Sequence, residues 1–215
     1  GTEGETQNPT NLRLRVQQIK NFITLLNVSQ GIPMVLMGDE MGRTQKGNNN
    51  AYCHDDPTTW VDWSLKEKHR EIWEFYSNMI HFRKRHECLR REHFFTGKRI
   101  GLGVRDITWH GVKPFQPDWS HVSHTLAFVI SGEDLDTFQA RDNDIYVAAN
   151  AFSSDLTFEL PLMPRKEWHR IVDTSLPFPY DFISESDAPL VRREYVVKAR
   201  SVLLLISKRV MLPTS

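Results

Sequence analysis

The sequence predicts two kinds of fold in succession, an α/β part and then an antiparallel β-sandwich. The α/β part is indicated by a helix-forming stripe followed by an apolar run over residues 32–37. This run is apolar on both faces and is bounded by Gly and Pro, as is typical of a buried parallel strand. The β-sandwich is indicated by several short strand-like runs after about residue 97. A helix followed by a buried strand is the order found in an α/β barrel or a doubly wound sheet.

Two helices are predicted in the α/β part. The first has Asn8 as its cap and Pro9 at its first helical position, and Gly31 ends it. Its apolar stripe consists of Ile19, Phe22, Ile23 and Leu26. The second helix begins at Ser64, which forms with Glu67 the spacing of a capping box. Its apolar stripe consists of Ile72, Phe75, Tyr76 and Met79.

Between the predicted strand and the second helix lies a long polar loop over residues 41–63. Loops of more than about 15 residues inside compact domains are usually functional or disordered. Two Trp residues and one Tyr residue in this loop argue against disorder. The sequence therefore predicts an ordered, functional loop.

The second half of the chain changes to a strand-like pattern with turn signals. The runs are residues 125–130, 144–149, 156–160, 168–172, 195–197 and 201–206. The change of pattern predicts an α/β part over residues 1–97, a β-sandwich domain over residues 98–208 and a tail over residues 209–215.

Composition excludes several classes of protein. Lys plus Arg and Asp plus Glu are both 27, so the formal charge is zero, which argues against a nucleic-acid partner and against attachment to anionic lipid. No apolar run approaches the length of a membrane span. The basic stretch 83–91 is interrupted by Glu87 and is expected to be a solvated helix end. Two Cys residues without metal-ligand spacing predict free thiols, and neither a metal nor a cofactor is expected.

Several motifs resemble those of glycoside hydrolase family 13. The run 31–40, Gly-Ile-Pro-Met-Val-Leu-Met-Gly-Asp-Glu, resembles the motif at the eighth barrel strand of that family. The loop segments are more specific and look like the isoamylase and glycogen-debranching subgroup: Gly-Arg-Thr at 42–44, Gly-Asn-Asn-Asn-Ala-Tyr-Cys at 47–53 and Trp-Val-Asp-Trp at 60–63. Segments 109–112, 116–120, 150–151 and 200–205 are similar to that subgroup's C-terminal domain. The resemblance extends to about residue 208.

The resemblance implies the C-terminal end of an eight-stranded β/α (TIM-like) barrel followed by a β-sandwich. It also implies hydrolysis of α-1,6-glucosidic branch linkages in glycogen or starch, by an Asp nucleophile, a Glu acid/base and a second Asp. The first six residues are similar to the segment just past the family's last catalytic motif, so all three carboxylates lie upstream of Gly1 in the family's order. No catalytic residue is therefore carried over to this chain, which reads as an interior piece of a longer protein.

The acidic residues of the chain agree with this interpretation. Retaining hydrolysis needs two carboxyl groups about 5–5.5 Å apart. Asp39 and Glu40 are adjacent on the predicted strand, so their side chains would point to opposite faces. Asp55 and Asp56 precede Pro57 and fit a turn better. The chain alone is expected to be inactive.

Substrate contacts are expected in the loop, because barrel active sites form at the C-terminal face. An Asn side chain can both donate to and accept from sugar hydroxyls, and a Tyr ring can stack on a pyranose. The candidate substrate-binding residues are Arg43, Asn48, Asn49, Asn50, Tyr52, Asp55 and Trp60. The alternative is a self-supporting loop, in which Asn residues stabilise turns and Arg43 pairs with Asp39 or Glu40.

The remaining Trp residues are expected to pack rather than to bind sugar. Trp63 directly precedes Ser64 and is expected to pack into the domain as a hydrophobic staple, whereas Trp60 is left open between stacking and packing. Trp109, Trp119 and Trp168 are expected in the core or between domains rather than on a starch-binding surface.

The sequence is consistent with three functions. The chain would be a piece of a debranching enzyme, a free-standing non-catalytic glucan-binding module, or one half of an enzyme made of two chains. The predicted helices and strand before residue 95 favour the first and the third. The expected partners are a branched α-glucan and the N-terminal part of the barrel. Without that part, the apolar strand is expected to pair with a second copy. The expected location is the cytoplasm, or the plastid for a plant or algal source.

Overall fold

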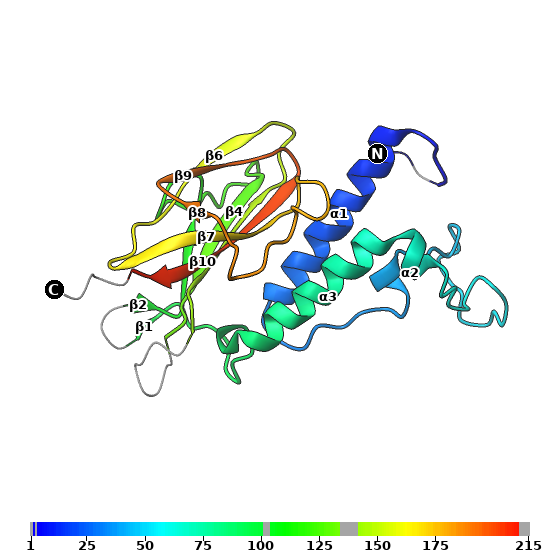
Figure 1. Cartoon of the computed structure of the whole chain (residues 1–215), viewed down its shortest axis with the longest axis horizontal. Helices are drawn as coiled ribbons and strands as arrows, with labels where there is room; N and C mark the ends of the chain where they lie inside the picture. The colour runs from blue at the N-terminus through cyan, green and yellow to red at the C-terminus, as the bar shows by residue number, and fades with distance from the viewer. Residues whose placement is uncertain (1, 3, 101–103, 134–141, 211–215) are drawn as a thin grey trace. The chain divides into compact units, whose positions relative to one another are not determined.

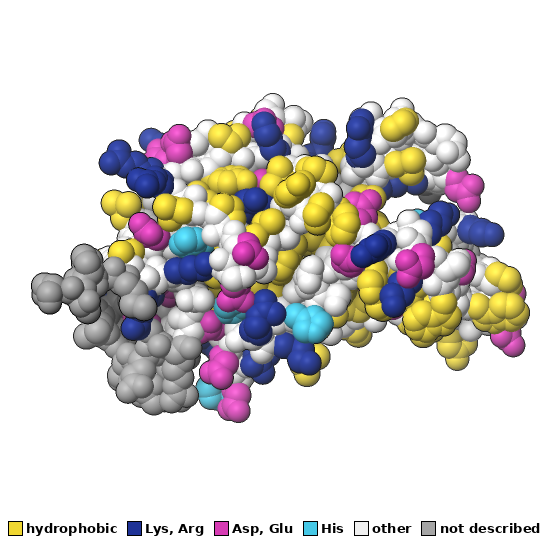
Figure 2. Space-filling view, viewed as in Figure 1, with side chains coloured by type: hydrophobic (Ala, Val, Ile, Leu, Met, Phe, Trp, Pro, Cys, Tyr) yellow, Lys and Arg dark blue, Asp and Glu magenta, His cyan; other side chains and the backbone are white. Residues whose placement is uncertain are grey.

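The computed structural model describes residues 2, 4–100, 104–133 and 142–210 (Figure 1). The chain divides into two compact units, Gly1–His81 and Phe82–Ser215. Among the described residues, no helix is long and apolar enough to cross a membrane. On the face shown in Figure 2, Lys and Arg side chains lie among Asp and Glu side chains rather than in one patch.

The first unit is helical. Helix α1 (Pro9–Val28) begins as predicted, since the Asn8 side chain accepts a hydrogen bond from the Thr10 N–H at 2.9 Å. Helix α3 (Arg70–Arg85) runs into the second unit. The buried Lys20 of α1 forms an ion pair with Glu71 of α3 at 3.0 Å and lies over the Phe75 ring. This ion pair fixes the two helices to each other.

The predicted capping box at Ser64 is wrong. The Ser64 hydroxyl donates to Asp62 at 2.6 Å and does not cap the helix. Only the short helix α2 (Leu65–Lys68) follows, and the chain turns at His69 before α3 begins. The Ser64 hydroxyl, which a capping box would use to cap the helix, is therefore bonded to the side chain of Asp62 two residues earlier.

The predicted strand over residues 32–37 is not formed. This segment has no secondary structure, and Ile32 and Met34 are 97% and 88% exposed. A parallel strand needs neighbours on both sides to pair its N–H and C=O groups. No described strand pairs with this segment, so the barrel part of the predicted fold is not shown.

The second unit is built on a six-stranded antiparallel sheet in the order β3-β4-β5-β10-β7-β8 (Figure 1). Two further antiparallel pairs are β1-β2 and β6-β9. The strands are β1 (Arg99–Ile100), β2 (Val104–Arg105), β3 (Ile107–His110), β4 (Thr125–Ile130), β5 (Ile145–Asn150), β6 (Leu156–Glu159), β7 (Lys166–Asp173), β8 (Leu190–Val191), β9 (Glu194–Val197) and β10 (Ser201–Arg209). The prediction of an antiparallel β-sheet domain in this half of the chain is confirmed.

One hydrophobic core joins the large sheet to the β6-β9 pair. Alternate residues of β4, β5, β7, β8 and β10 point into it, because side chains alternate between the faces of a strand. The small sheet adds Phe158 and Val197. The buried Asn150 donates to the carbonyl oxygens of Ser154, Val197 and Lys198 at 2.9–3.1 Å. Apolar packing and one amide side chain thus hold two layers together, as a sandwich requires.

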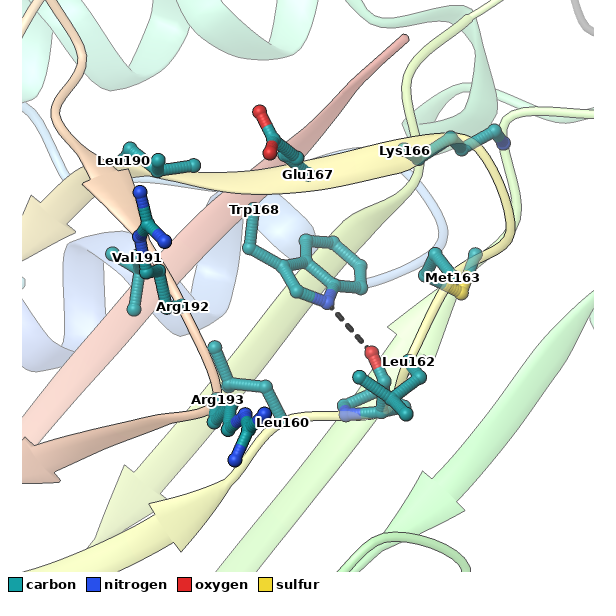
Figure 3. A pocket seen from close by; sticks show the side chains of 11 residues that line it. Leu160, Leu162, Met163, Lys166, Glu167, Trp168, Leu190, Val191, Arg192 and Arg193 are labelled. Atoms are coloured by element: carbon teal, nitrogen blue, oxygen red, sulfur yellow. Dashed lines mark hydrogen bonds between the residues drawn. The ribbon is translucent and has the colours of Figure 1, made fainter. Parts of the chain in front are cut away.

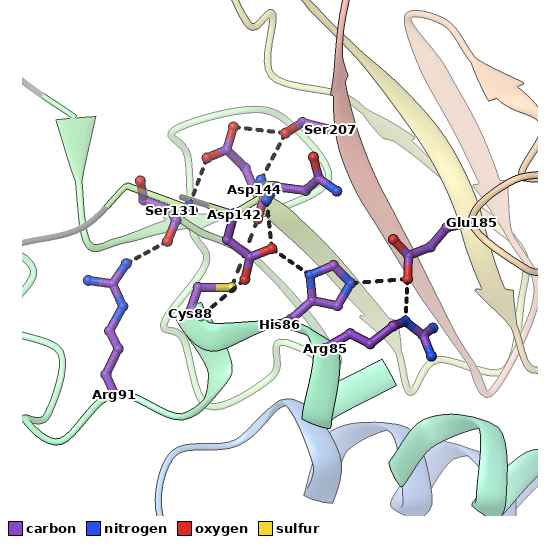
Figure 4. A network of polar contacts seen from close by, with 11 residues as sticks. Arg85, His86, Cys88, Arg91, Ser131, Asp142, Asp144, Glu185 and Ser207 are labelled. Carbon is purple, nitrogen blue, oxygen red and sulfur yellow. Dashed lines mark hydrogen bonds and ion pairs between the residues drawn. The ribbon is translucent and has the colours of Figure 1, made fainter. Parts of the chain in front are cut away.

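A polar network fixes the segment after α3 to the sheet of the second unit (Figure 4). The buried His86 donates through Nδ1 to Asp142 at 2.6 Å, and the Cys88 N–H donates to the other oxygen of Asp142 at 3.1 Å. Burial raises the pKa of Asp142, but these hydrogen bonds outweigh it and hold the pKa below its ordinary value. Arg91 donates to the carbonyl oxygens of Ser131 and Glu133. This segment therefore belongs to the second compact unit, which begins at Phe82, and the predicted domain ranges 1–97, 98–208 and 209–215 stay a prediction.

Candidate functional site

The candidate site is the loop from Gly38 to Trp63 in the first unit, called the 38–63 loop below. It starts with a short 3₁₀ turn, η1 (Asp39–Met41), between Gly38 and Gly42, which both have positive φ. A Cβ atom on Gly38 would lie 2.5 Å from Cδ of Arg43. Glycine is therefore required here, because it lets the Arg43 side chain pass directly over the backbone.

Arg43 holds the two ends of the loop together. Its Nη2 donates to the Thr58 carbonyl oxygen at 2.9 Å, and its Nη1 donates to the Met37 carbonyl oxygen at 3.4 Å. A planar guanidinium can serve several carbonyl groups at once, which an ammonium group cannot do with the same geometry. Arg43 was predicted to bind substrate or to pair with a carboxylate. The hydrogen bonds of its guanidinium support the loop, and substrate binding by Arg43 stays a prediction.

Of the three consecutive Asn residues, Asn48 has an internal role. Its Oδ1 accepts the Asn50 backbone N–H at 2.9 Å, its Nδ2 lies 3.2 Å from Nε2 of His54, and its carbonyl accepts from Gln45 at 2.8 Å. Asn49 and Asn50 are exposed. The structure thus separates one Asn that shapes the turn from two that face solvent.

Three aromatic residues of this loop are exposed to solvent, namely Tyr52, Trp60 and Trp63. Tyr52 is 97% exposed. Trp60 is exposed as well, and its Nε1 donates to Asp55 at 2.9 Å, which fixes the orientation of the indole. Trp63 is also exposed, so the predicted staple is not seen in this unit. Asp55 therefore supports Trp60, whose ring is exposed in the first unit, and stacking of Trp60 on a sugar stays a prediction.

A second acidic side chain, which was not among the predicted site residues, organises the middle of the loop. Asp56 accepts the Thr58 N–H at 2.7 Å and lies 3.1 Å from Nδ1 of His54. The hydrogen bonds from Thr58 and then from His54 lower the pKa of Asp56 to about 2. The sequence signal was present, because an Asp two residues before Thr and next to Pro is typical of an Asx turn.

The carboxylates of the loop are engaged within it. Glu40 accepts the Gly38 N–H at 2.8 Å. Burial, followed by the charge of Glu40, raises the pKa of Asp39, while Asp62 binds Ser64. Among the residues that the structure describes, no group of three His, Cys, Asp or Glu side chains is placed to hold a metal. The loop therefore presents three exposed aromatic rings and two exposed amide side chains to solvent.

A separate pocket of about 260 Å³ lies in the second unit (Figure 3). Leu160, Trp168 and Val191 line it and are buried, while Arg192 and Arg193 are exposed. The Trp168 Nε1 donates to the Pro161 carbonyl at 2.9 Å, so its polar group is already used. Trp168 packs in the core as predicted, and this pocket offers no open aromatic face to a sugar.

A family model, "Isoamylase 1-3, C-terminal", matches residues 108–215, which include the six-stranded sheet of the second unit. This chain belongs to the isoamylase 1–3 C-terminal family. Among its relatives, isoamylase 1, chloroplastic, from Oryza sativa subsp. japonica is 40% identical over 86% of this chain and 21% of its own length. The glycogen operon protein GlgX homolog of Mycobacterium tuberculosis is 36% identical over 95% of this chain and 30% of its own length. This isoamylase-family chain therefore spans only 21–30% of these relatives.

Solved structures share the fold of this isoamylase-family chain. A pullulanase from Bacillus acidopullulyticus aligns with a TM-score of 0.67 and 23% identity over 94% of this chain and 21% of that one. A Bacillus subtilis pullulanase in complex with maltose aligns with a TM-score of 0.64 and 20% identity, over 94% of this chain and 24% of that one. At this level of identity the comparison supports the fold alone.

The family model begins after the 38–63 loop, but the longer relatives include it. An alignment that covers 95% of the chain leaves out about 11 of its 215 residues. Most of the loop must therefore lie inside the alignment with the GlgX homolog. The loop is thus part of the region shared with the GlgX homolog.

Proposed function

We propose that this chain forms the C-terminal part of an enzyme that hydrolyses α-1,6-glucosidic branch linkages, and that its 38–63 loop contacts the branched α-glucan. The observation that supports this most strongly is the exposure of Tyr52 and Trp60 on a loop that Arg43, Asp55 and Asp56 brace from within. A braced loop loses little conformational entropy when it binds a ligand.

The exposed side chains suit an uncharged sugar. The rings of Tyr52 and Trp60 offer apolar faces for pyranose rings, and the Tyr52 hydroxyl can donate to or accept from a sugar hydroxyl. Asn49 and Asn50 add exposed amides, each with a donor and an acceptor. In the proposed site, Arg43, Asn48 and Asp55 shape the loop while Asn49, Asn50, Tyr52 and Trp60 contact substrate.

The apolar segment 32–37 supports the assignment of the first unit to a barrel. Five large apolar side chains are exposed within these six residues, namely Ile32, Met34, Val35, Leu36 and Met37. Such a run of exposed apolar side chains marks a surface that another part of a protein covers. We propose that this segment is the eighth strand when neighbouring barrel strands are present. The proposed location is the cytoplasm or a plastid, in line with the two kinds of relative.

The chain by itself is proposed to have no hydrolytic activity. The carboxylates of Glu40, Asp55 and Asp56 accept hydrogen bonds within the loop, and Asp62 accepts from Ser64 just after it. Such groups are poor candidates for an acid and a nucleophile across one sugar. A reducing-sugar assay with pullulan and amylopectin should give the buffer rate. Turnover that copurifies with the chain would contradict this part of the proposal.

Binding tests the loop directly. Maltoheptaose titrated into the ¹⁵N-tryptophan-labelled chain should shift the indole signal of Trp60, and Tyr52→Ala should weaken that response about three- to tenfold, the effect of losing one stacked ring. Tyr180→Ala is a matched control, because Tyr180 is also exposed but lies in the second unit. Equal loss in both variants, or no response of Trp60 in the parent chain, would refute glucan contact by this loop.

A further inference from the structure

An exposed aromatic cluster lies on the β3–β4 connection of the second unit. This connection, residues 111–124, exposes Phe115, Trp119 and Val122, and Trp109 of β3 lies beside it. Trp119 is 65% exposed and Trp109 is 38% exposed, whereas both were predicted to pack away from solvent. Trp168 of the same unit is buried, so the Trp residues of this unit differ in exposure.

The two indoles form an angled surface. Trp109 and Trp119 meet edge to face, with ring centroids 5.5 Å apart and planes 73° apart. On its other side Trp109 packs against Phe128 of β4 at 5.5 Å. Trp109 is therefore held by the sheet and in turn supports Trp119, which leaves much of the Trp119 ring free.

The backbone that carries Trp119 is closely constrained. Nδ1 of the buried His110 accepts the Phe115 N–H at 2.8 Å and holds Phe115 at a φ of 60°. A Cβ atom on Gly111 would lie 2.3 Å from the Gln116 carbonyl oxygen, so only glycine fits there. On the other side of Trp119, Asp118 accepts the Ser120 N–H at 2.9 Å. The connection is preorganised rather than loose.

The charge of the connection points to an uncharged ligand. Between residues 111 and 124 one Lys, Lys113, balances one Asp, Asp118, and His is counted as neutral. The side chains around Trp119 otherwise carry amide, hydroxyl and imidazole groups, namely Gln116, Ser120, His121 and Ser123. Such groups hydrogen-bond to sugar hydroxyls, while rings set at a steep angle follow a curved chain better than a flat one.

We propose that Trp119, supported by Trp109, forms a second α-glucan contact that binds a linear α-1,4-linked segment away from the 38–63 loop. The choice of an α-glucan rests on the proposed function, whereas the aromatic surface does not depend on the loop. A contact of this kind holds a neighbouring chain of the same polymer and raises the local concentration of substrate.

The two contacts can be separated by one titration. Maltoheptaose is added to the ¹⁵N-tryptophan-labelled chain, and the indole signals of Trp60, Trp119 and Trp168 are followed. The Trp119 signal is expected to shift, and the signal of the buried Trp168 serves as the unaffected reference. Trp119→Ala should weaken retention of the chain in amylopectin-containing gels about three- to tenfold, whereas Trp119→Phe, which keeps a flat ring, should retain most of it. Phe94→Ala, an exposed aromatic of the same unit, is the matched control.

Each outcome decides one contact. The second contact is overturned if the Trp119 signal does not move, or if Trp119→Ala and Phe94→Ala reduce gel retention equally. The cluster would then be assigned to packing against another part of a longer protein. An equal response to cellopentaose overturns the choice of an α-glucan. If Trp119 responds while Trp60 and Tyr52→Ala do not, the second contact stands and glucan contact by the loop fails.

Discussion

Two connections present aromatic rings to solvent in this chain, and they are held in place by different chemistry. The 38–63 loop relies on charged side chains, with Arg43 bonded to Thr58 and Asp56 bonded to Thr58 and His54. The 111–124 connection relies on a buried neutral imidazole, His110, and on an adjacent sheet. Rings of similar exposure can therefore differ in what destabilises them. In the first connection, the pKa of Asp56 is lowered to about 2, so its carboxylate stays ionised in moderate acid. In the second connection, protonation of the His110 imidazole removes the acceptor of the Phe115 N–H.

The largest effect is expected from the hydrophobic core of the second unit. Leu203 is fully buried in the core that joins the two sheets. Leu203→Ala should lower the free energy of unfolding of the second unit by about 3–5 kcal/mol, because it removes buried apolar atoms and leaves a cavity. Urea denaturation followed by circular dichroism measures the loss. A change below about 1 kcal/mol would mean that this core is not close-packed.

The second-largest effect is expected from low pH, which should lower the free energy of unfolding through protonation of His110. Burial lowers the pKa of His110 from 6.5 to about 4. A His whose folded pKa is depressed is protonated more readily in the unfolded chain, so the free energy of unfolding should fall as the pH is lowered from about 6.5 to 4, by up to about 3 kcal/mol. Urea midpoints between pH 7 and pH 4 test this.

The control for the acid experiment is His110→Asn, whose side-chain oxygen can still accept the Phe115 N–H but does not titrate in this range. This variant should lose most of the pH dependence between 6.5 and 4. Asp56 acts at lower pH. Because its pKa is lowered to about 2, its contribution to the free energy of unfolding is fully present above pH 3.8 and is lost as the pH falls through about 2. An unchanged slope in His110→Asn would assign the acid sensitivity to another group.

A smaller effect is expected from Arg43→Lys. One ammonium group cannot reach the Thr58 and Met37 carbonyl oxygens with the geometry of a guanidinium, so about 1 kcal/mol of local stability should be lost. Amide hydrogen exchange should speed up within residues 44–58 but not within 111–124. Faster exchange in both regions would show that the two connections are not independent.

The smallest effect is expected from Asp55→Asn. A neutral amide oxygen still accepts from the Trp60 Nε1, but a hydrogen bond to a charged acceptor is the stronger one. The Trp60 indole signal should shift, with a change in unfolding free energy below about 0.5 kcal/mol. If the Trp60 signal stays in place, Asp55 does not orient the indole in solution.

Local signals in the sequence predicted local structure well. Asn8 and Pro9 mark the start of α1, and the run 201–206 lies within β10. The predictions that failed depended on partners far away in the chain or on competition between neighbours. The segment 32–37 has the apolar pattern of a strand, but no described strand pairs with it. Ser64 does not cap a helix, because its hydroxyl is bonded to Asp62.

The substrate-binding roles assigned to the loop stay a prediction, but its internal contacts can be compared with the sequence. The sequence located the aromatic loop, yet it could not show that Arg43 and Asn48 bond to the loop itself, because those contacts depend on how the chain turns back on itself. The exposure of Trp119 was missed for a related reason. A Trp residue is usually at least partly buried. Trp109 contacts both Phe128 and Trp119, and much of the Trp119 ring is left in solvent, which the sequence does not show.

The position of β10 has a consequence for synthesis on the ribosome. Although β10 is the last strand of the sheet in sequence, it lies between β5 and β7 and pairs with both. Until residues 201–209 have emerged, β3, β4 and β5 can pair with one another, but the sheet cannot be joined to β7 and β8. The nascent domain therefore exposes two unpaired strand edges to chaperones and to neighbouring chains, and one nine-residue segment closes both at once.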